Sequence, residues 1–197
     1  MADRINIRID DVLTESKQWA GKRGPKERFL QMSRWVHQAG NKVQYTPTIL
    51  VEDIAKYSEV IEYIKHSTAE GKMAPALHGY QHIDYGSLPD QIVKDHLSKS
   101  LDWFHDYLWY TPSVWATPWG AYTNRLKDLA WEFSLKLEGV QGLHSPGSWL
   151  DVARKEGFCS SPVFDHWWVR GQKLLRVVEV IKAGSYDIAK ENRPDIF

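Results

Sequence analysis

The feature of this sequence that most restricts its fold is a regular alternation of strand-like and helix-like segments. Ile5, Ile7 and Ile9 alternate with polar residues, a pattern typical of a β-strand. From residue 25 onward, apolar residues recur every three or four positions, which predicts a helix that Gly40 ends. Strands that alternate with helices form parallel sheets, because each helix carries the chain back to the edge where the next strand begins.

The same alternation continues along the whole chain. Further strands are expected at residues 42–51, 73–77, 113–117, 139–143, 159–164 and 186–189. Helices are expected between them, at residues 54–70, 90–104, 124–135, 148–156 and 174–181. About seven strand–helix units follow one another without a linker, so residues 1–197 are expected to form one domain with a loose tail at 190–197. The predicted fold class is α/β, with a parallel sheet that is either open or closed into a barrel.

Composition excludes several classes of function. The formal net charge is zero and no long run of Lys or Arg occurs, which argues against binding of nucleic acid or of an acidic membrane. Cys159 is the only cysteine, so the chain has neither an internal disulfide nor a multi-cysteine metal site. The first residues lack the apolar segment of a signal peptide, and no stretch approaches the roughly 20 apolar residues of a membrane span. A cytoplasmic location is therefore expected.

Two motifs follow predicted strands and carry possible metal ligands. In parallel α/β folds the chemistry takes place at the carboxyl ends of the strands. Asp10 and Asp11 end the first strand, and His78 and His82 follow the third in the run His-Gly-Tyr-Gln-His. A carboxylate and two imidazoles supply three ligands and leave one position open for water, as in catalytic zinc sites. Solvated loop carboxylates and hydrogen-bonded loop histidines are the structural alternatives.

Two later loops carry aromatic residues beside possible catalytic groups. Residues 115–122 read Trp-Ala-Thr-Pro-Trp-Gly-Ala-Tyr, in which Pro118 and Gly120 fix a tight loop able to present backbone N–H groups. His166 follows the sixth predicted strand and is able to protonate a leaving group. An ordinary turn with core tryptophans and a buried, hydrogen-bonded histidine are the alternatives. All four motifs fall at the same predicted end of the sheet.

In this order the motifs resemble those of the polysaccharide deacetylase family, that is carbohydrate esterase family four with its nodulation-type deacetylases. The family pattern is an Asp-Asp pair, His-x-x-x-His, Arg-x-Pro-x-Gly and a late His. These fall here on residues 10–11, 78–82 and 116–120 and on His166, and the resemblance spans about residues 4–188. It implies a distorted (β/α) barrel with about seven parallel strands. It also implies a metal-dependent hydrolase that removes N- or O-linked acetyl groups from a sugar or glycan.

The resemblance also assigns roles to individual residues. Asp10 would be the general base, His166 the general acid, and the backbone N–H of Trp119 a donor to the oxyanion. The implied metal ligands are Asp11, His78 and His82. The aromatic loops themselves, rather than the family pattern, predict substrate contacts at Trp115, Pro118 and Trp168. Zn²⁺ is the first expectation for the metal, with Co²⁺, Ni²⁺ and Mn²⁺ as alternatives that this ligand set accepts.

The chain departs from the family pattern at two places. Ala116 stands where the family has an arginine that orients the base, and Arg-Ile-Asp-Asp-Val replaces the usual Thr-Phe-Asp-Asp-Gly. The chain therefore resembles a divergent branch. Two other functions are compatible with the motifs: a metal-independent amide hydrolase of the same fold, and a non-catalytic glycan-binding protein. The expected partner is an acetylated sugar or glycan, without nucleic acid or membrane, and the sequence leaves the oligomeric state open.

Overall fold

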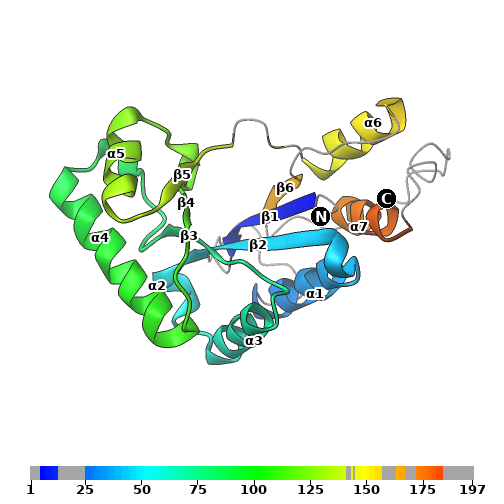
Figure 1. The fold of residues 1–197 in the computed structure, drawn as a ribbon, viewed down its shortest axis with the longest axis horizontal. Coiled ribbons are helices and arrows are strands. Elements are labelled where there is room, and N and C mark those ends of the chain that lie inside the picture. Colours follow the sequence, from blue (N-terminus) through cyan, green and yellow to red (C-terminus); the bar gives the residue numbers. More distant parts are fainter. Residues whose placement is uncertain are drawn as a thin grey trace.

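Six parallel strands form one sheet in the computed structural model, which describes residues 5–12, 25–140, 143, 145–156, 163–166 and 172–183. The strands are β1 (Ile5–Val12), β2 (Val43–Leu50), β3 (Ala76–Gly79), β4 (Val114–Ala116), β5 (Lys136–Glu138) and β6 (Val163–His166). Their order in the sheet is β5-β4-β3-β2-β1-β6 (Figure 1). Strands β1 to β5 thus follow chain order and β6 joins β1 from the other side. This is the strand order of a (β/α) barrel in which, among the described residues, β5 and β6 do not pair.

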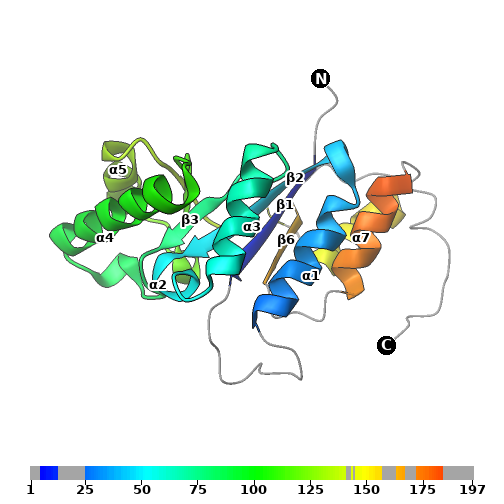
Figure 2. The ribbon, with the colours of Figure 1, turned by 90° about the horizontal axis from the view of Figure 1, so that it is seen from below.

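Helices connect the strands and cover the sheet. They are α1 (Pro25–His37), α2 (Val51–Ile54), α3 (Ser58–Ala69), α4 (Asp90–Trp103), α5 (Asn124–Glu132), α6 (Pro146–Glu156) and α7 (Gln172–Ala183). Single turns are η1 (Gly40–Lys42), η2 (Tyr85–Ser87), the π-helical η3 (Phe104–Leu108) and η4 (Pro118–Gly120). Helices α1, α3 and α7 lie side by side over β1, β2 and β6 (Figure 2). Among the described residues, no helix combines the length and the apolar character needed to cross a membrane.

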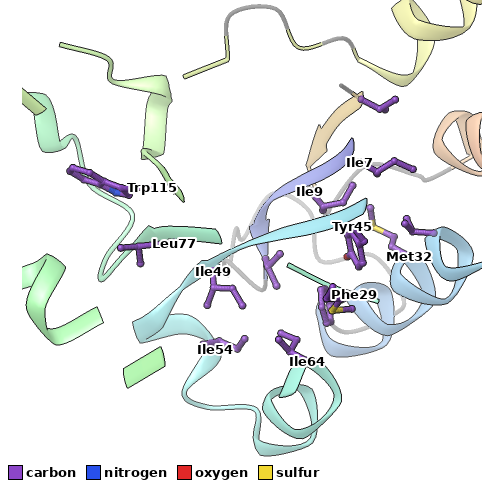
Figure 3. Packing of buried hydrophobic residues seen from close by; sticks show 14 of the residues in the cluster. Ile7, Ile9, Phe29, Met32, Tyr45, Ile49, Ile54, Ile64, Leu77 and Trp115 are labelled. Atoms are coloured by element: carbon purple, nitrogen blue, oxygen red, sulfur yellow. The ribbon is translucent and has the colours of Figure 1, made fainter. Parts of the chain in front are cut away.

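One side of the sheet forms the hydrophobic core. Ile7 of β1 is the register partner of Tyr45 of β2, and alternate residues of a strand point to the same side, so Ile7 and Ile9 share a side with Tyr45 and Ile49. These side chains are fully buried. Figure 3 shows them facing Phe29 of α1 and neighbouring helix side chains. Each fully buried isoleucine contributes roughly 1.5–3 kcal/mol of transfer free energy, so this side fixes the register of the central strands.

The other side of the same strands is polar or small. The register places Arg8 next to Thr46, and Thr48 next to Ala76. By the same alternation, His78 shares that side. Among the described strand residues, no apolar layer of this kind therefore lies on the side that carries the Asp-Asp and His-x-x-x-His motifs. The alternation of residues along the strands thus gives the sheet an apolar side that stabilises the fold and a polar side that carries the candidate catalytic and metal-binding residues.

The predicted fold class is confirmed, and the differences lie at element boundaries. The fifth strand occupies residues 136–138 rather than 139–143, and the preceding helix ends at Glu132. The reason is Ser134, whose φ of 58° is left-handed. There Leu135 N–H donates to the Ala130 carbonyl and Ser134 N–H to the Trp131 carbonyl, which is a Schellman motif with serine in place of the usual glycine. The strand predicted at 186–189 and the tail at 190–197 lie outside the described residues.

Replacing Ser134 by glycine is expected to stabilise the protein. A left-handed conformation costs a residue with a Cβ roughly 1–2 kcal/mol, which glycine avoids. The Ser134→Gly variant should therefore raise the midpoint of thermal unfolding by a few degrees, read by circular dichroism or calorimetry. The matched control is Ser98→Gly in the exposed interior of α4, which should lower the midpoint because glycine weakens a regular helix. Equal shifts in the two variants would contradict the role assigned to Ser134.

Candidate metal centre

An irregularity at the end of β1 turns two neighbouring carboxylates to one side of the sheet. On a regular strand Asp10 and Asp11 would point to opposite sides. Here the register with β2 shifts between Ile9 and Val12, and Asp11 has a left-handed φ of 55°. As a result the Asp10 carboxylate meets Arg8, and the Asp11 carboxylate meets His78 across the sheet. Strain of this kind at a non-glycine residue is typical of functional sites.

The three metal ligands predicted from the sequence lie together. The Asp11 Oδ1 atom lies 2.7 Å from His78 Nε2 and 2.9 Å from His82 Nε2. The candidate ligand atoms all lie within 4.8 Å of one another. Asp11 and His78 are buried and His82 is half-buried, so the cluster opens toward solvent on the His82 side. A divalent ion bound by these three side chains would keep a position for an exogenous ligand.

The hydrogen bonding of His78 indicates that this cluster fits a metal ion. His78 Nδ1 contacts the backbone carbonyl of Ala116, which accepts a hydrogen bond from it. The Nδ1 atom of His78 therefore carries a proton, so in the neutral ring Nε2 presents its lone pair to the Asp11 carboxylate. Two acceptors at 2.7 Å require a positive charge between them, either a proton or a cation. A carbonyl that fixes the tautomer of a histidine is the usual support of a histidine–metal bond.

The charges of the cluster also suit a cation. Burial by itself would raise the pKa of Asp11, but the hydrogen bonds and positive charge of His78 and His82 outweigh burial and hold that pKa well below the usual range of a carboxyl. The hydrogen bond to Asp11 raises the pKa of His82, although partial burial opposes it. Asp11 therefore stays ionised, and a proton and a metal ion compete for the same place.

The loop that carries both histidines is shaped by Tyr85, a residue that no sequence motif singles out. The fully buried Tyr85 hydroxyl accepts hydrogen bonds from the backbone N–H groups of Tyr80, at 2.9 Å, and of Gln81, at 3.4 Å. Gly79 has a φ of +151°, and a Cβ at this position would lie 2.8 Å from the Tyr85 ring. Only glycine therefore allows Tyr85 to hold the segment between His78 and His82.

A second buried group lies next to the candidate ligands. The Arg8 guanidinium donates two parallel hydrogen bonds of 2.8 Å to the Asp10 carboxylate, from Nε and from Nη2. Its Nη1 atom donates to the backbone carbonyl of Gly139, at 3.0 Å. The sequence indicated Arg8 only as a polar residue of the first strand, because its partner Gly139 lies 131 positions along the chain. The predicted base thus has a fixed orientation.

The loop after β4 exposes one tryptophan and buries another. Trp119 is 76% exposed, adopts a left-handed φ of 59°, and its ring meets the His82 ring edge-on with centroids 5.0 Å apart. Trp115, in contrast, is fully buried and packs edge-on against Tyr85. The predicted substrate contact at Trp115 is therefore wrong, because its ring belongs to the apolar side of the sheet. Pro118 is also buried, so in this structure it shapes the loop rather than offering a surface.

The remaining predicted site residues lie partly or wholly outside the described residues. The backbone of His166 is the register partner of Asp10 on β6, which brings the last sequence motif beside the first. The orientation of the His166 side chain and the whole of Trp168 lie outside the described residues. The structure thus supports the strand position of His166, while the roles predicted for both side chains stay predictions.

Comparison with solved structures shows the fold. The chain superposes on a family 4 carbohydrate esterase from Streptomyces lividans with a TM-score of 0.66 and 14% identity, over 92% of this chain and 86% of that one. A peptidoglycan deacetylase from Bacillus subtilis gives 0.64 and 11%, over 93% and 85%. A pseudoenzyme of the same family from Bacillus anthracis gives 0.68 and 12%, over 92% and 61%. No protein-family model and no curated protein matches the sequence.

These likenesses define the fold as the distorted (β/α) barrel of the family 4 carbohydrate esterases, in a divergent form. They bear out the resemblance drawn from the motifs. Because active deacetylases and a pseudoenzyme share this fold, the fold alone leaves catalysis open.

Replacing Gly79 by alanine is expected to disrupt the histidine loop. The new Cβ would overlap the Tyr85 ring, and overpacking of this kind typically costs about 1–3 kcal/mol. The Gly79→Ala variant should lose stability and bind Zn²⁺ more weakly, as measured by thermal unfolding and titration calorimetry. In the control Gly71→Ala, φ is also positive but no atom lies within 4 Å of the new Cβ. That variant should lose some stability and keep its Zn²⁺ affinity; equal Zn²⁺ affinity in both variants would contradict the role of Tyr85.

Proposed function

We propose that the protein is a metal-dependent hydrolase that removes an acetyl group, N- or O-linked, from a sugar or glycan. The observation that carries the proposal is the cluster of Asp11, His78 and His82 at the carboxyl end of the sheet, with Asp10 next to it along the chain. The likeness to family 4 carbohydrate esterases supports the choice of acetylated carbohydrate among the possible substrates.

The candidate ligands define where the scissile acetyl group would lie. When bound, a divalent ion, with Zn²⁺ as our first choice, supplies Lewis-acid polarisation of a carbonyl and activation of water near neutral pH. His82 is the most exposed of the three ligand residues, so substrate would approach from the side of His82 and Trp119. Asp11 and His78 are buried and hydrogen-bonded, which keeps their ligand atoms in place while substrate enters.

Three groups of the chain would move or hold protons around that position. Asp10, oriented by Arg8, would accept the proton of the attacking water as general base. The backbone N–H of Trp119 would donate to the oxygen that gains negative charge, which typically contributes about 3–4 kcal/mol in comparable enzymes. His166, next to Asp10 in the register, would donate a proton to the departing amine or alcohol.

The exposed ring of Trp119 would serve as the platform for the sugar. A large aromatic surface left in water is costly, and here it lies at the solvent side of the cluster, against His82. Trp119 also has a left-handed backbone, a strained conformation that is typical of functional sites. Trp168 would provide a second contact with the substrate.

One alternative function has support from the comparisons. A similar structure is a pseudoenzyme, and the family arginine is replaced by Ala116, so a glycan-binding protein without catalysis is the second candidate. A metal-independent amide hydrolase is less favoured, because all three candidate metal ligands converge. The two candidates differ in one measurable product, which is free acetate.

Loss of the metal ligands is expected to abolish acetate release. The protein should release acetate from members of a panel of N- and O-acetylated sugars, and a chelator should stop it until Zn²⁺ is restored. The Asp11→Ala variant should retain no stoichiometric metal and release no acetate, because a carboxylate ligand is removed. The control is Asp106→Ala, an exposed carboxylate on η3, which should behave as the wild type.

Two outcomes would contradict the proposal. Full turnover by Asp11→Ala would exclude a metal held by this cluster. Sugar binding without acetate release, by a wild-type protein shown to contain metal, would favour the glycan-binding alternative.

Truncation of Trp119 is expected to weaken substrate binding and spare the chemical step. The Trp119→Ala variant keeps the backbone N–H, so KM should rise about tenfold, equivalent to about 1.4 kcal/mol, with kcat little changed. Steady-state kinetics with the best substrate of the panel measures both constants. Trp131→Ala, which removes a similarly exposed ring from α5, is the control and should leave KM unchanged. A loss confined to kcat would contradict a stacking role.

A further inference from the structure

Arg8 is a buried cation on the polar side of the sheet. Its side chain is only 2% exposed, although it begins on the first strand and carries a full positive charge. A charge so deeply buried persists only where hydrogen bonds and opposite charge replace the lost water. Its partners include the Asp10 carboxylate, the Gly139 carbonyl and, at 3.9 Å, the Glu138 carboxylate.

The contact with Asp10 fixes an orientation as well as a charge. Both carboxylate oxygens of Asp10 accept a hydrogen bond of 2.8 Å from the planar guanidinium. A two-point pairing allows neither rotation nor displacement of the carboxylate, unlike a single contact with a lysine. The third contact, from Nη1 to the Gly139 carbonyl, holds the guanidinium itself at the end of β5. The Asp10 carboxylate is thus held by contacts that involve both β1 and the end of β5, two strands that are not neighbours in the sheet.

Small residues lie on the same side of the sheet as this long side chain. Ala116 of β4 is the register partner of Glu138, the residue that faces Arg8, and Ala76 of β3 lies on the same side of the sheet. Both alanines are buried. A long side chain at residue 116 would start on the side of the sheet that the Arg8 guanidinium occupies. The family arginine is absent at residue 116, where this chain has alanine, and an arginine is present at residue 8 instead. The two differences are therefore structurally linked.

We infer that Arg8 is the positioning residue for Asp10, and that it replaces from β1 the arginine that the family pattern places at residue 116. Arg8 acts through Asp10, which it holds by two parallel hydrogen bonds. The inference rests on the proposed function, in which Asp10 is the general base. It predicts that Ala116 causes no loss of activity.

The positioning itself is tested without any assay of activity. Arg8→Lys keeps the charge but cannot form two parallel hydrogen bonds. In its crystal structure the Asp10 carboxylate should take a new orientation or more than one, while Asp11, His78 and His82 superpose on the wild type. An Asp10 carboxylate that keeps its orientation would overturn the inference. This comparison decides the positioning role even if the wild-type protein releases no acetate, an outcome that would count against the proposed function alone.

The catalytic consequence is tested by kinetics on the metal-loaded protein. A misplaced base affects the chemical step, so Arg8→Lys and Arg8→Thr should lower kcat about a hundredfold. KM for the acetylated sugar and the affinity for Zn²⁺ should stay at the wild-type values. Unchanged kcat in a folded variant would overturn the inference. Parallel loss of kcat and of Zn²⁺ affinity would also overturn it, because Arg8 would then support the metal centre rather than Asp10.

Two further variants separate positioning from stability. Ile7→Ala removes a buried side chain from the opposite side of the same strand, so it should lower the unfolding midpoint and leave kcat unchanged below that midpoint. The double variant Arg8→Thr, Ala116→Arg returns the arginine to the family position, and it should recover at least tenfold in kcat over Arg8→Thr. A double variant whose new guanidinium pairs with Asp10 in the crystal structure, but whose kcat stays at the Arg8→Thr level, would overturn the inference.

Discussion

The ion pair between Arg8 and Asp10 is the interaction on which the polar side of the sheet depends. Both groups are buried and together with Gly139 they connect β1 to β5. A pair of this kind contributes little net stability, because the desolvation of two charges offsets their attraction. Removing one partner, however, typically costs about 3–5 kcal/mol, because the other charge stays buried without compensation. The pair therefore constrains geometry far more than it stabilises the fold.

Stability comes instead from the opposite side of the same strands. Ile7, Ile9 and Tyr45 pack against α1, and this apolar layer tolerates strain at the strand ends (Figure 3). Asp11 and Trp119 both adopt left-handed conformations where β1 and β4 end. Each costs roughly 1–2 kcal/mol, and each brings a group to the candidate metal centre that a regular strand would direct elsewhere.

Local patterns in the sequence predicted the strands and three converging ligands, and tertiary contacts explain what those patterns missed. The alternation of isoleucines in β1 and the spacing of His78 and His82 depend on neighbours along the chain, so they can be read directly. The pairing of Arg8 with Gly139, and the contact of Tyr85 with Gly79, depend on chain segments that only the fold brings together. Trp115 was assigned to the substrate because its loop is aromatic, but strand alternation places its ring in the core.

The same contacts change the meaning of Ala116. Taken by itself, the loss of an arginine from the third motif suggests a catalytically impaired protein, and a pseudoenzyme shares this fold. A guanidinium can reach a carboxylate from any strand whose side chain enters the same space, because what orients a base is the position of the donor atoms. Arg8 supplies those atoms from two residues before Asp10, and Ala116, the register partner of the Glu138 that Arg8 faces, carries only a methyl group. In a divergent barrel, the loss of a motif arginine therefore indicates a loss of activity only where no other buried cation pairs with the catalytic carboxylate.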